Sequence, residues 1–138
     1  MIGTIDMQHM RYINLFEKIS DVSTKYCFKY NETIFFCVPR SMISKSIGEN
    51  GKNVKQLSRI LGKKIKIIPE PRGEEDLKTF IENIVAPVQF KDFQLLENEI
   101  TVSGNTQTKA SLIGRNKRRL LEMQEIIKNF FSRDFRVV

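Results

Sequence analysis

The spacing of apolar residues along the chain changes several times between that of a helix and that of a strand. Met10, Ile13, Phe16 and Ile19 recur every three residues, which predicts a helix with one apolar face. Residues 34–38 instead form a continuous apolar run rich in aromatic and β-branched side chains, which predicts a strand. The first half of the chain is therefore predicted to have the order helix, strand, strand, helix, glycine turn, helix, strand. The expected bounds are 4–20, 26–30, 33–38, 41–47, 48–51, 52–61 and 65–68.

The second half of the chain shows the same order of elements. A helix begins at Glu74 and Pro87 ends it. The expected bounds of the later strands and helices are 88–96, 99–103, 106–113, 117–131 and 135–138. Between the halves, Pro69 and Pro71 lack the N–H group that a strand or helix uses, and Gly73 follows them. We predict an α+β fold of two modules, residues 1–71 and 72–138, each with a three-stranded sheet packed on helices.

The two halves also share a short motif. Residues 46–54 match residues 112–120 at an offset of 66, which is close to half the chain. Isoleucine, glycine and asparagine coincide in the two segments, and a cation and an apolar residue follow in both. An internal repeat of this kind favours two related modules over one domain.

The turn at residues 48–51, with the sequence Gly-Glu-Asn-Gly, joins two predicted helices and has a chemical use. Glycine lacks a β-carbon, so the backbone can take positive φ and approach a sugar-phosphate chain closely. The helix that follows presents unpaired N–H groups to a phosphate. Lys45, Lys52 and Lys55 place cations around the turn, and apolar side chains near Ile47 would floor a groove for unstacked bases.

The charge of the chain favours an anionic partner. The 138 residues include 23 Lys and Arg against 16 Asp and Glu, a formal net charge of +7. Nucleic acid is the commonest polyanion that basic proteins bind, and a membrane surface is the next. Residues 1–72 hold 13 cations and 6 anions, whereas residues 73–138 hold 10 of each. We therefore expect the first half to dominate nonspecific attraction.

Several function classes are excluded by what the sequence lacks. The longest apolar run is far short of the roughly 20 residues that span a bilayer. The N-terminus has no apolar stretch of signal-peptide length, so we expect a cytoplasmic protein without a membrane partner. One His and two Cys give no closed zinc site without carboxylates, and no nucleophile–base arrangement is visible. We expect no enzyme activity, no catalytic residue, no metal, no cofactor and no small-molecule substrate.

The two cysteines, Cys27 and Cys37, fall on the two strands of the first predicted hairpin. A three-residue loop around Glu32 would let them face each other across the hairpin, and a redox link is then conceivable. Buried free thiols are the commoner outcome in a reducing compartment.

Residues 47–54, Ile-Gly-Glu-Asn-Gly-Lys-Asn-Val, resemble the signature loop of KH domains, and the element order resembles the type II arrangement of that fold. Two such modules joined by a short proline-containing linker resemble the KH pair of the NusA family of transcription factors, and in particular its short archaeal members. The resemblance implies sequence-tolerant binding of single-stranded RNA, with each loop gripping the backbone while bases lie in the groove. It also implies a role in transcription termination or elongation through nascent RNA, and contact with RNA polymerase. Bacterial members carry an N-terminal polymerase-binding region and an S1 domain, for which 138 residues leave no room.

The motif predicts RNA-binding residues around both turns. In the first module they are Lys45, Ile47, Gly48, Glu49, Asn50, Gly51, Lys52 and Lys55. In the second module they are Ile113, Gly114, Arg115, Asn116, Lys117, Arg118 and Arg119. Lys117 replaces the second glycine of the turn, and a β-carbon in a left-handed conformation costs about 1–2 kcal/mol. Because four cations surround this turn, we expect the second module to rely more on charge than on close backbone approach.

Two other interpretations remain open. A KH-type ribosomal RNA-binding or ribosome-assembly protein would show the same loops and the same charge. The paired type II order and the two-module length favour the transcription factor over it. A structural or interaction module without an RNA role is the third interpretation.

Overall fold

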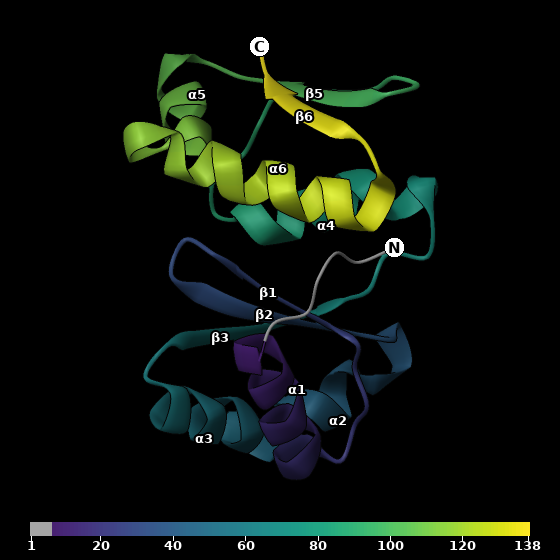
Figure 1. Ribbon diagram of the computed structural model, residues 1–138, viewed down its shortest axis with the longest axis vertical. Coiled ribbons are helices and arrows are strands. Elements are labelled where there is room, and N and C mark those ends of the chain that lie inside the picture. Colours follow the sequence, from purple (N-terminus) through teal and green to yellow (C-terminus); the bar gives the residue numbers. More distant parts are fainter. Residues whose placement is uncertain (1–6) are drawn as a thin grey trace. The chain divides into compact units, whose positions relative to one another are not determined.

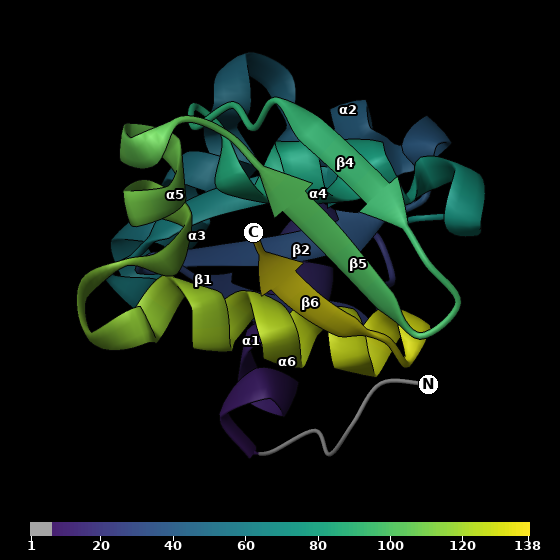
Figure 2. The same ribbon diagram turned by 90° about the horizontal axis from the view of Figure 1, so that it is seen from above.

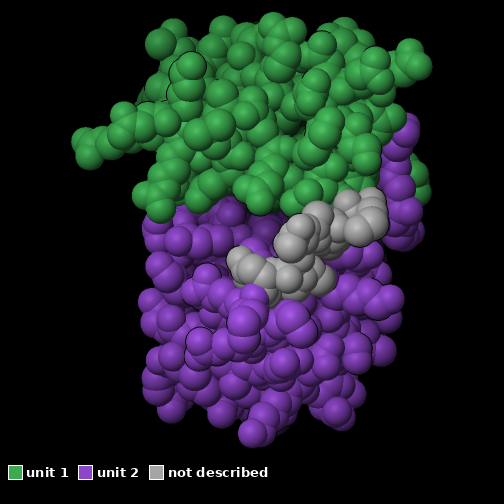
Figure 3. Space-filling view, viewed as in Figure 1, with its two compact units in different colours: residues 1–3, 75–138 green, residues 4–74 purple. Residues whose placement is uncertain are grey.

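The computed structural model describes residues 7–138, which divide into two compact units between Glu74 and Glu75 (Figure 3). We call residues 7–74 the N-terminal unit and residues 75–138 the C-terminal unit. Each unit is an α+β structure with one three-stranded sheet. The first three residues of the expected 4–20 helix lie outside the described residues.

The N-terminal unit consists of a sheet with three helices on one face (Figure 1). Its elements are α1 (Met7–Ser20), β1 (Tyr26–Tyr30), β2 (Thr33–Val38), α2 (Ile43–Ile47), α3 (Lys52–Leu61) and β3 (Lys64–Pro69). Single 3₁₀ turns at Arg40–Met42 and Glu49–Gly51 precede α2 and α3. Strand β2 is central, because it pairs antiparallel with β1 and parallel with β3.

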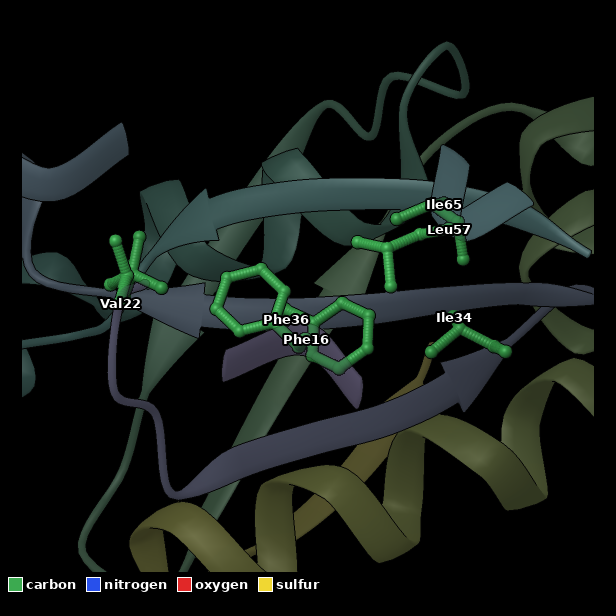
Figure 4. Close-up of a cluster of buried hydrophobic side chains, with 7 residues drawn as sticks. Phe16, Val22, Ile34, Phe36, Leu57 and Ile65 are labelled. Atoms are coloured by element: carbon green, nitrogen blue, oxygen red, sulfur yellow. The ribbon is translucent and has the colours of Figure 1, made fainter. Parts of the chain in front are cut away.

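The core of the N-terminal unit lies between β2 and the helices. Successive strand residues point to opposite faces, so Ile34, Phe36 and Val38 share the face that the helices cover. The ring of Phe16 in α1 stacks on Phe36 with 4.5 Å between centroids, and Leu57 of α3 packs into the same cluster (Figure 4). This packing fixes where α3 begins, and with it the position of the glycine turn.

The C-terminal unit repeats the order of strands and helices. Its elements are α4 (Leu77–Val85), β4 (Asp92–Leu95), β5 (Glu99–Ser103), α5 (Thr106–Ile113), α6 (Arg118–Phe131) and β6 (Asp134–Val137). Single 3₁₀ turns at Glu74–Asp76 and Arg115–Lys117 precede α4 and α6. Strand β5 pairs antiparallel with β4 and parallel with β6, and the three helices lie on one face of this sheet (Figure 2).

The α+β class and the three-stranded sheets are as the apolar pattern predicted. The prediction of a strand over 88–96 was too long, because β4 begins only at Asp92. Its partner β5 ends at Ser103, opposite Asp92, so residues 88–91 have no strand to continue on. The prediction that Met10 belongs to the apolar face of α1 was also wrong, since its side chain is 53% exposed.

The prediction that Cys27 and Cys37 could face each other is contradicted by the register of the hairpin. Cys27 pairs with Phe36, and Cys37 pairs with Tyr26, so the two thiols point to opposite faces of the sheet. The cause is the length of the turn. It has two residues, Asn31 and Glu32, both with positive φ, rather than the three that would bring the cysteines opposite each other.

The environment of Cys37 lowers the reactivity of its thiol. Burial raises the pKa of this thiol, and the nearby Cys27 and Glu70 raise it further. Since the thiolate is the nucleophile, a raised pKa leaves less reactive sulfur at any given pH.

We predict that iodoacetamide at pH 8 alkylates Cys27 faster than Cys37 in the folded protein, and both at similar rates in denaturant. Mass spectrometry of the digested protein measures the two rates. Equal rates in the folded protein, or a Cys27–Cys37 disulfide formed under mild oxidation, would contradict the register described above.

Candidate nucleic-acid interface

The turn between α2 and α3 follows an unusual backbone path. Helix α2 ends at Ile47, and Gly48 then takes φ 82° and ψ 163°, a conformation that is essentially restricted to glycine. Asn50 and Gly51 both follow in the left-handed region, at φ 55° and 73°. The N–H of Gly51 donates to the carbonyl of Gly48 at 3.0 Å and closes the turn. The chain then enters α3 at Lys52, whose N–H donates to the carbonyl of Glu49.

Gly48 is required for steric reasons as well as for its dihedral angles. A β-carbon at this position would lie 2.8 Å from Cγ of Asn53, closer than real side chains come. A β-carbon at Gly51 would have no closer neighbour than Cε of Lys55, at 3.9 Å. The two glycines of the motif therefore have different roles, because the first allows the close approach of α2 to α3 and the second only eases a positive φ.

Asn53 fastens the end of α2 to the start of α3. Its side-chain amide donates to the carbonyl oxygens of Lys45 and Ser46, at 3.2 and 3.1 Å. These two bonds satisfy carbonyls in the last turn of α2, which have no partner inside that helix. Asn53 is 7% exposed, so the link is shielded from water. We did not predict this residue from the sequence, although a polar residue four positions before Leu57 on the buried face of α3 was a usable signal.

The turn between α5 and α6 has the same backbone path. Gly114 takes φ 75° and ψ 172°, and Asn116 and Lys117 follow at φ 57° and 61°. The N–H of Lys117 donates to the carbonyl of Gly114 at 3.2 Å. Lys117 thus occupies the left-handed position that Gly51 has in the other unit, without glycine's freedom.

Arg119 stands where Asn53 stands in the other unit, and it supports the turn differently. A β-carbon on Gly114 would lie 2.5 Å from Cγ of Arg119, so the aliphatic part of this arginine fills the space beside the glycine. Its Nε lies 3.3 Å from a carboxylate oxygen of Glu122, and its side chain is only 12% exposed. The structure therefore places Arg119 beneath the turn, whereas its three neighbouring cations are exposed.

The predicted site residues gather at each turn as two separate groups. Near the first turn, Glu49, Asn50, Lys52 and Lys55 are exposed, while Ile47, Gly48 and Gly51 are half-buried. Near the second, Arg115, Asn116, Lys117 and Arg118 are exposed, while Ile113 and Gly114 are half-buried. Lys45 is exposed and lies 3.7 Å from the carboxylate of Asp21, an ion pair too solvated to hold it firmly.

A depression of about 490 Å³ lies beside the first turn. The end of α1, helix α2, the turn and the start of α3 form its walls. Its lining residues are Ile19, Ser20, Ser44, Lys45, Gly48, Glu49, Lys52, Asn53 and Gln56. The lining is mainly polar and includes two lysines, which suits a phosphate or sugar group better than an apolar ligand.

Residues 7–138 contain neither a cluster of metal-ligating side chains nor a membrane-spanning helix. No three His, Cys, Asp or Glu side chains in this part of the chain gather as a metal ion would need. No helix in the same residues is long and apolar enough to cross a membrane.

The sequence is similar to archaeal proteins named "probable transcription termination protein NusA". The Methanococcus vannielii protein is 36% identical over 88 residues, which are 64% of this chain and 49% of the relative. The Methanocaldococcus jannaschii protein is 38% identical over 80 residues, or 58% of this chain and 42% of the relative. The Thermoplasma acidophilum protein is 23% identical over 133 residues, covering 94% and 90%. The resemblance to archaeal NusA-like proteins is thus confirmed, although the chain spans about half the length of the first two relatives or less.

Two further comparisons concern the family and the fold. No protein-family model matches the chain. The crystal structure of APE1850 superposes on it with a TM-score of 0.68 and 21% sequence identity, covering 96% of this chain and 99% of the other. At that identity the comparison shows that the fold is shared.

We predict that Lys117→Gly raises the free energy of unfolding by about 1 kcal/mol, because it removes a β-carbon from a left-handed position. Thermal or urea unfolding measures the change. The matched control is Gly51→Lys, which places the same side chain at the corresponding position of the other turn and should lower stability by a similar amount. A destabilising Lys117→Gly would mean that the lysine side chain makes contacts that outweigh its strain.

Proposed function

We propose that this protein binds single-stranded RNA through two type II KH-like modules, residues 1–71 and 72–138, and acts in transcription termination or elongation by contacting nascent RNA. The observation that carries the proposal is the shared path of the two turns. In both, a glycine that tolerates no β-carbon is followed by two left-handed residues and the start of a helix. This function is binding rather than catalysis.

The backbone of each turn suits a phosphodiester chain. The residues that precede α3 and α6, Gly51 and Lys117, make no side-chain capping bond, and the N–H groups of Lys52 and Arg118 donate to the carbonyls of Glu49 and Arg115. The N-terminal end of a helix, with its N–H groups and the positive end of the dipole, attracts a phosphate. The expectation that side chains near Ile47 floor the groove is not met at the first turn, because Ile19 and not Ile47 lines the depression there. Ile47 and Ile113 lie directly before the glycines and are half-buried, and we propose that unstacked bases contact them and Ile19.

The charges at the two turns support the same proposal. Neither α3 nor α6 has an acidic residue in its first turn, and both begin with a cation, Lys52 and Arg118. Cations at a helix N-terminus oppose the helix dipole and lower stability by about 0.3–1 kcal/mol each. An anion bound at the turn would offset this cost.

The role in transcription rests on the relatives. The archaeal proteins that match this chain are named as probable transcription termination proteins. We extend that role to this chain, with nascent RNA as its ligand and RNA polymerase as a further partner. Co-purification with RNA polymerase is the expected result in cells, whereas co-purification with ribosomal particles would favour the ribosomal alternative.

We predict that the double change Glu49→Asp and Asn50→Asp lowers the affinity for a labelled single-stranded RNA by at least about ten-fold. The change at Asn50 adds a carboxylate, and the shorter side chain at position 49 brings its carboxylate closer to the backbone of the turn, where the phosphate is proposed to bind. Both side chains are exposed, and aspartate tolerates the left-handed conformation of Asn50, so the fold should be kept. Fluorescence anisotropy measures the affinity, and circular dichroism checks the fold.

Asn14→Asp is the matched control, since it adds one negative charge to an exposed position of α1 in the same unit. This control should bind RNA nearly as the parent does. If the double variant binds RNA with the affinity of the parent protein, the first turn is not part of the binding site.

We also predict that changing Arg115, Lys117 and Arg118 together to Gln makes RNA affinity less dependent on salt. The slope of log affinity against log salt should fall by up to about 2, because each lost phosphate contact removes about 0.7 for a single strand. Arg119 is kept, since its packing beneath Gly114 would confuse the result. Changing Lys78, Lys91 and Lys109 to Gln removes the same charge elsewhere in the C-terminal unit. An equal change of slope in both variants would show that total charge, and not the turn, sets the salt dependence.

A further inference from the structure

Three cations form a row along the outer face of α3. Lys52, Lys55 and Arg59 are separated by three and four residues, which places them within about 60° of one another around the helix axis. All three side chains are exposed, while Asn53 and Leu57 on the opposite side are buried. We call these three residues the α3 cation row. It begins at the glycine turn and extends for about 10 Å along the helix.

The cation row lies on a helix that has no acidic residue of its own. Helix α3 contains no Asp or Glu, and within residues 7–138 no ion pair involves Lys52, Lys55 or Arg59. Other cations of the same unit do lie close to carboxylates. Lys29 and Lys63 both contact Glu32, at 3.5 and 3.0 Å. The row therefore concentrates positive charge on one surface beside the turn, where Glu49 is the one acidic residue lining the depression with Lys52. Such a surface raises the local concentration of a polyanion.

The corresponding surface of α6 lacks this row. At the positions of α6 that correspond to the α3 cation row, the residues are Arg118, Leu121 and Glu125. All three are exposed, and Leu121 is 58% exposed, so this helix offers one cation, an apolar side chain and an anion to solvent. The turns of the two units follow the same path, but only α3 continues the positive charge away from its turn.

We propose that a single-stranded RNA leaving the first turn continues along the outer face of α3, with its phosphates on Lys52, Lys55 and Arg59. The proposal rests on the proposed function and extends its footprint beyond the turn. The N-terminal unit then binds a longer stretch of RNA than the C-terminal unit, where Glu125 repels a strand that would take the same course along α6. Arg59 is the member of the row farthest from the turn, so it contacts only RNA that is long enough to reach it.

The test compares two RNA lengths with two variants of the full chain. The short RNA is an oligouridine of about four nucleotides, the number that one KH loop clamps, and the long RNA has about three times that length. Arg59→Glu introduces the residue type that α6 has at its corresponding position. Lys25→Glu is the matched control, with the same change of charge at an exposed site between α1 and β1.

The parent protein should bind the long RNA more tightly than the short one. Arg59→Glu should weaken binding of the long RNA by roughly ten-fold and lower its salt slope by about 0.7, the contribution of one phosphate contact. Binding of the short RNA should change no more than in Lys25→Glu. Thermal unfolding checks that both variants keep the fold.

The measurements distinguish a failure of the proposed RNA binding from a failure of the proposed path along α3. If the parent binds neither RNA, the proposed function fails. If the parent binds both RNAs and Arg59→Glu weakens them equally, or no more than Lys25→Glu does, the path along α3 is overturned and the function stands. The path along α3 would also be overturned if Arg59→Glu abolished binding of an acidic peptide and left the affinity for both RNAs unchanged.

Discussion

The close approach of two helices at a glycine controls the rest of each site. At Gly48 and Gly114 the backbone takes a conformation that other residues avoid, and a β-carbon would collide with the side chain five residues later. Because of this contact, the helix after the turn starts immediately beside the end of the helix before it. The N-terminal ends of α3 and of α6 thereby follow closely after a half-buried apolar residue, Ile47 or Ile113. In the proposed function, this helix end holds a phosphate and the apolar side chain contacts a base of the same nucleotide chain.

The two turns share one backbone path, but different side chains stabilise it in the two units. In the N-terminal unit, Asn53 donates two buried hydrogen bonds to the end of α2, and a glycine takes the second left-handed position. In the C-terminal unit, the stem of Arg119 packs beneath the turn, and Lys117 takes that position. At Gly51, a β-carbon would meet nothing closer than 3.9 Å. The corresponding position of the other turn is exposed, which explains why the side chain of Lys117 is tolerated. The C-terminal turn thus keeps its backbone geometry while adding a cation.

The elements that the sequence predicted well are those with strong local signals. The bounds of β1, β2, α3, β5 and α5 match the apolar pattern, because β-branched runs, glycine stops and an asparagine cap define them locally. The length of β4 failed because it depends on where its partner β5 ends, which is a tertiary property. The expectation that the two cysteines could face each other failed because one residue in the hairpin turn changes which face each thiol occupies. The commoner outcome, two free thiols, is the one observed. The positions of the two turns were predictable from the spacing of their residues. Asn53 could have been noticed as a polar residue on the buried face of α3, but its bonding partners and the packing of Arg119 depend on how closely two helices approach.

The central claim is that both turns bind the sugar-phosphate backbone of single-stranded RNA. Titration of the ¹⁵N-labelled protein with a short oligouridine, followed by NMR amide shifts, tests it most directly. We expect the largest amide shifts at residues 48–53 and 114–119. These shifts should saturate with added RNA and become smaller as the salt concentration is raised. Shifts concentrated on the outer faces of the sheets, with the amides of both turns unchanged, would contradict it.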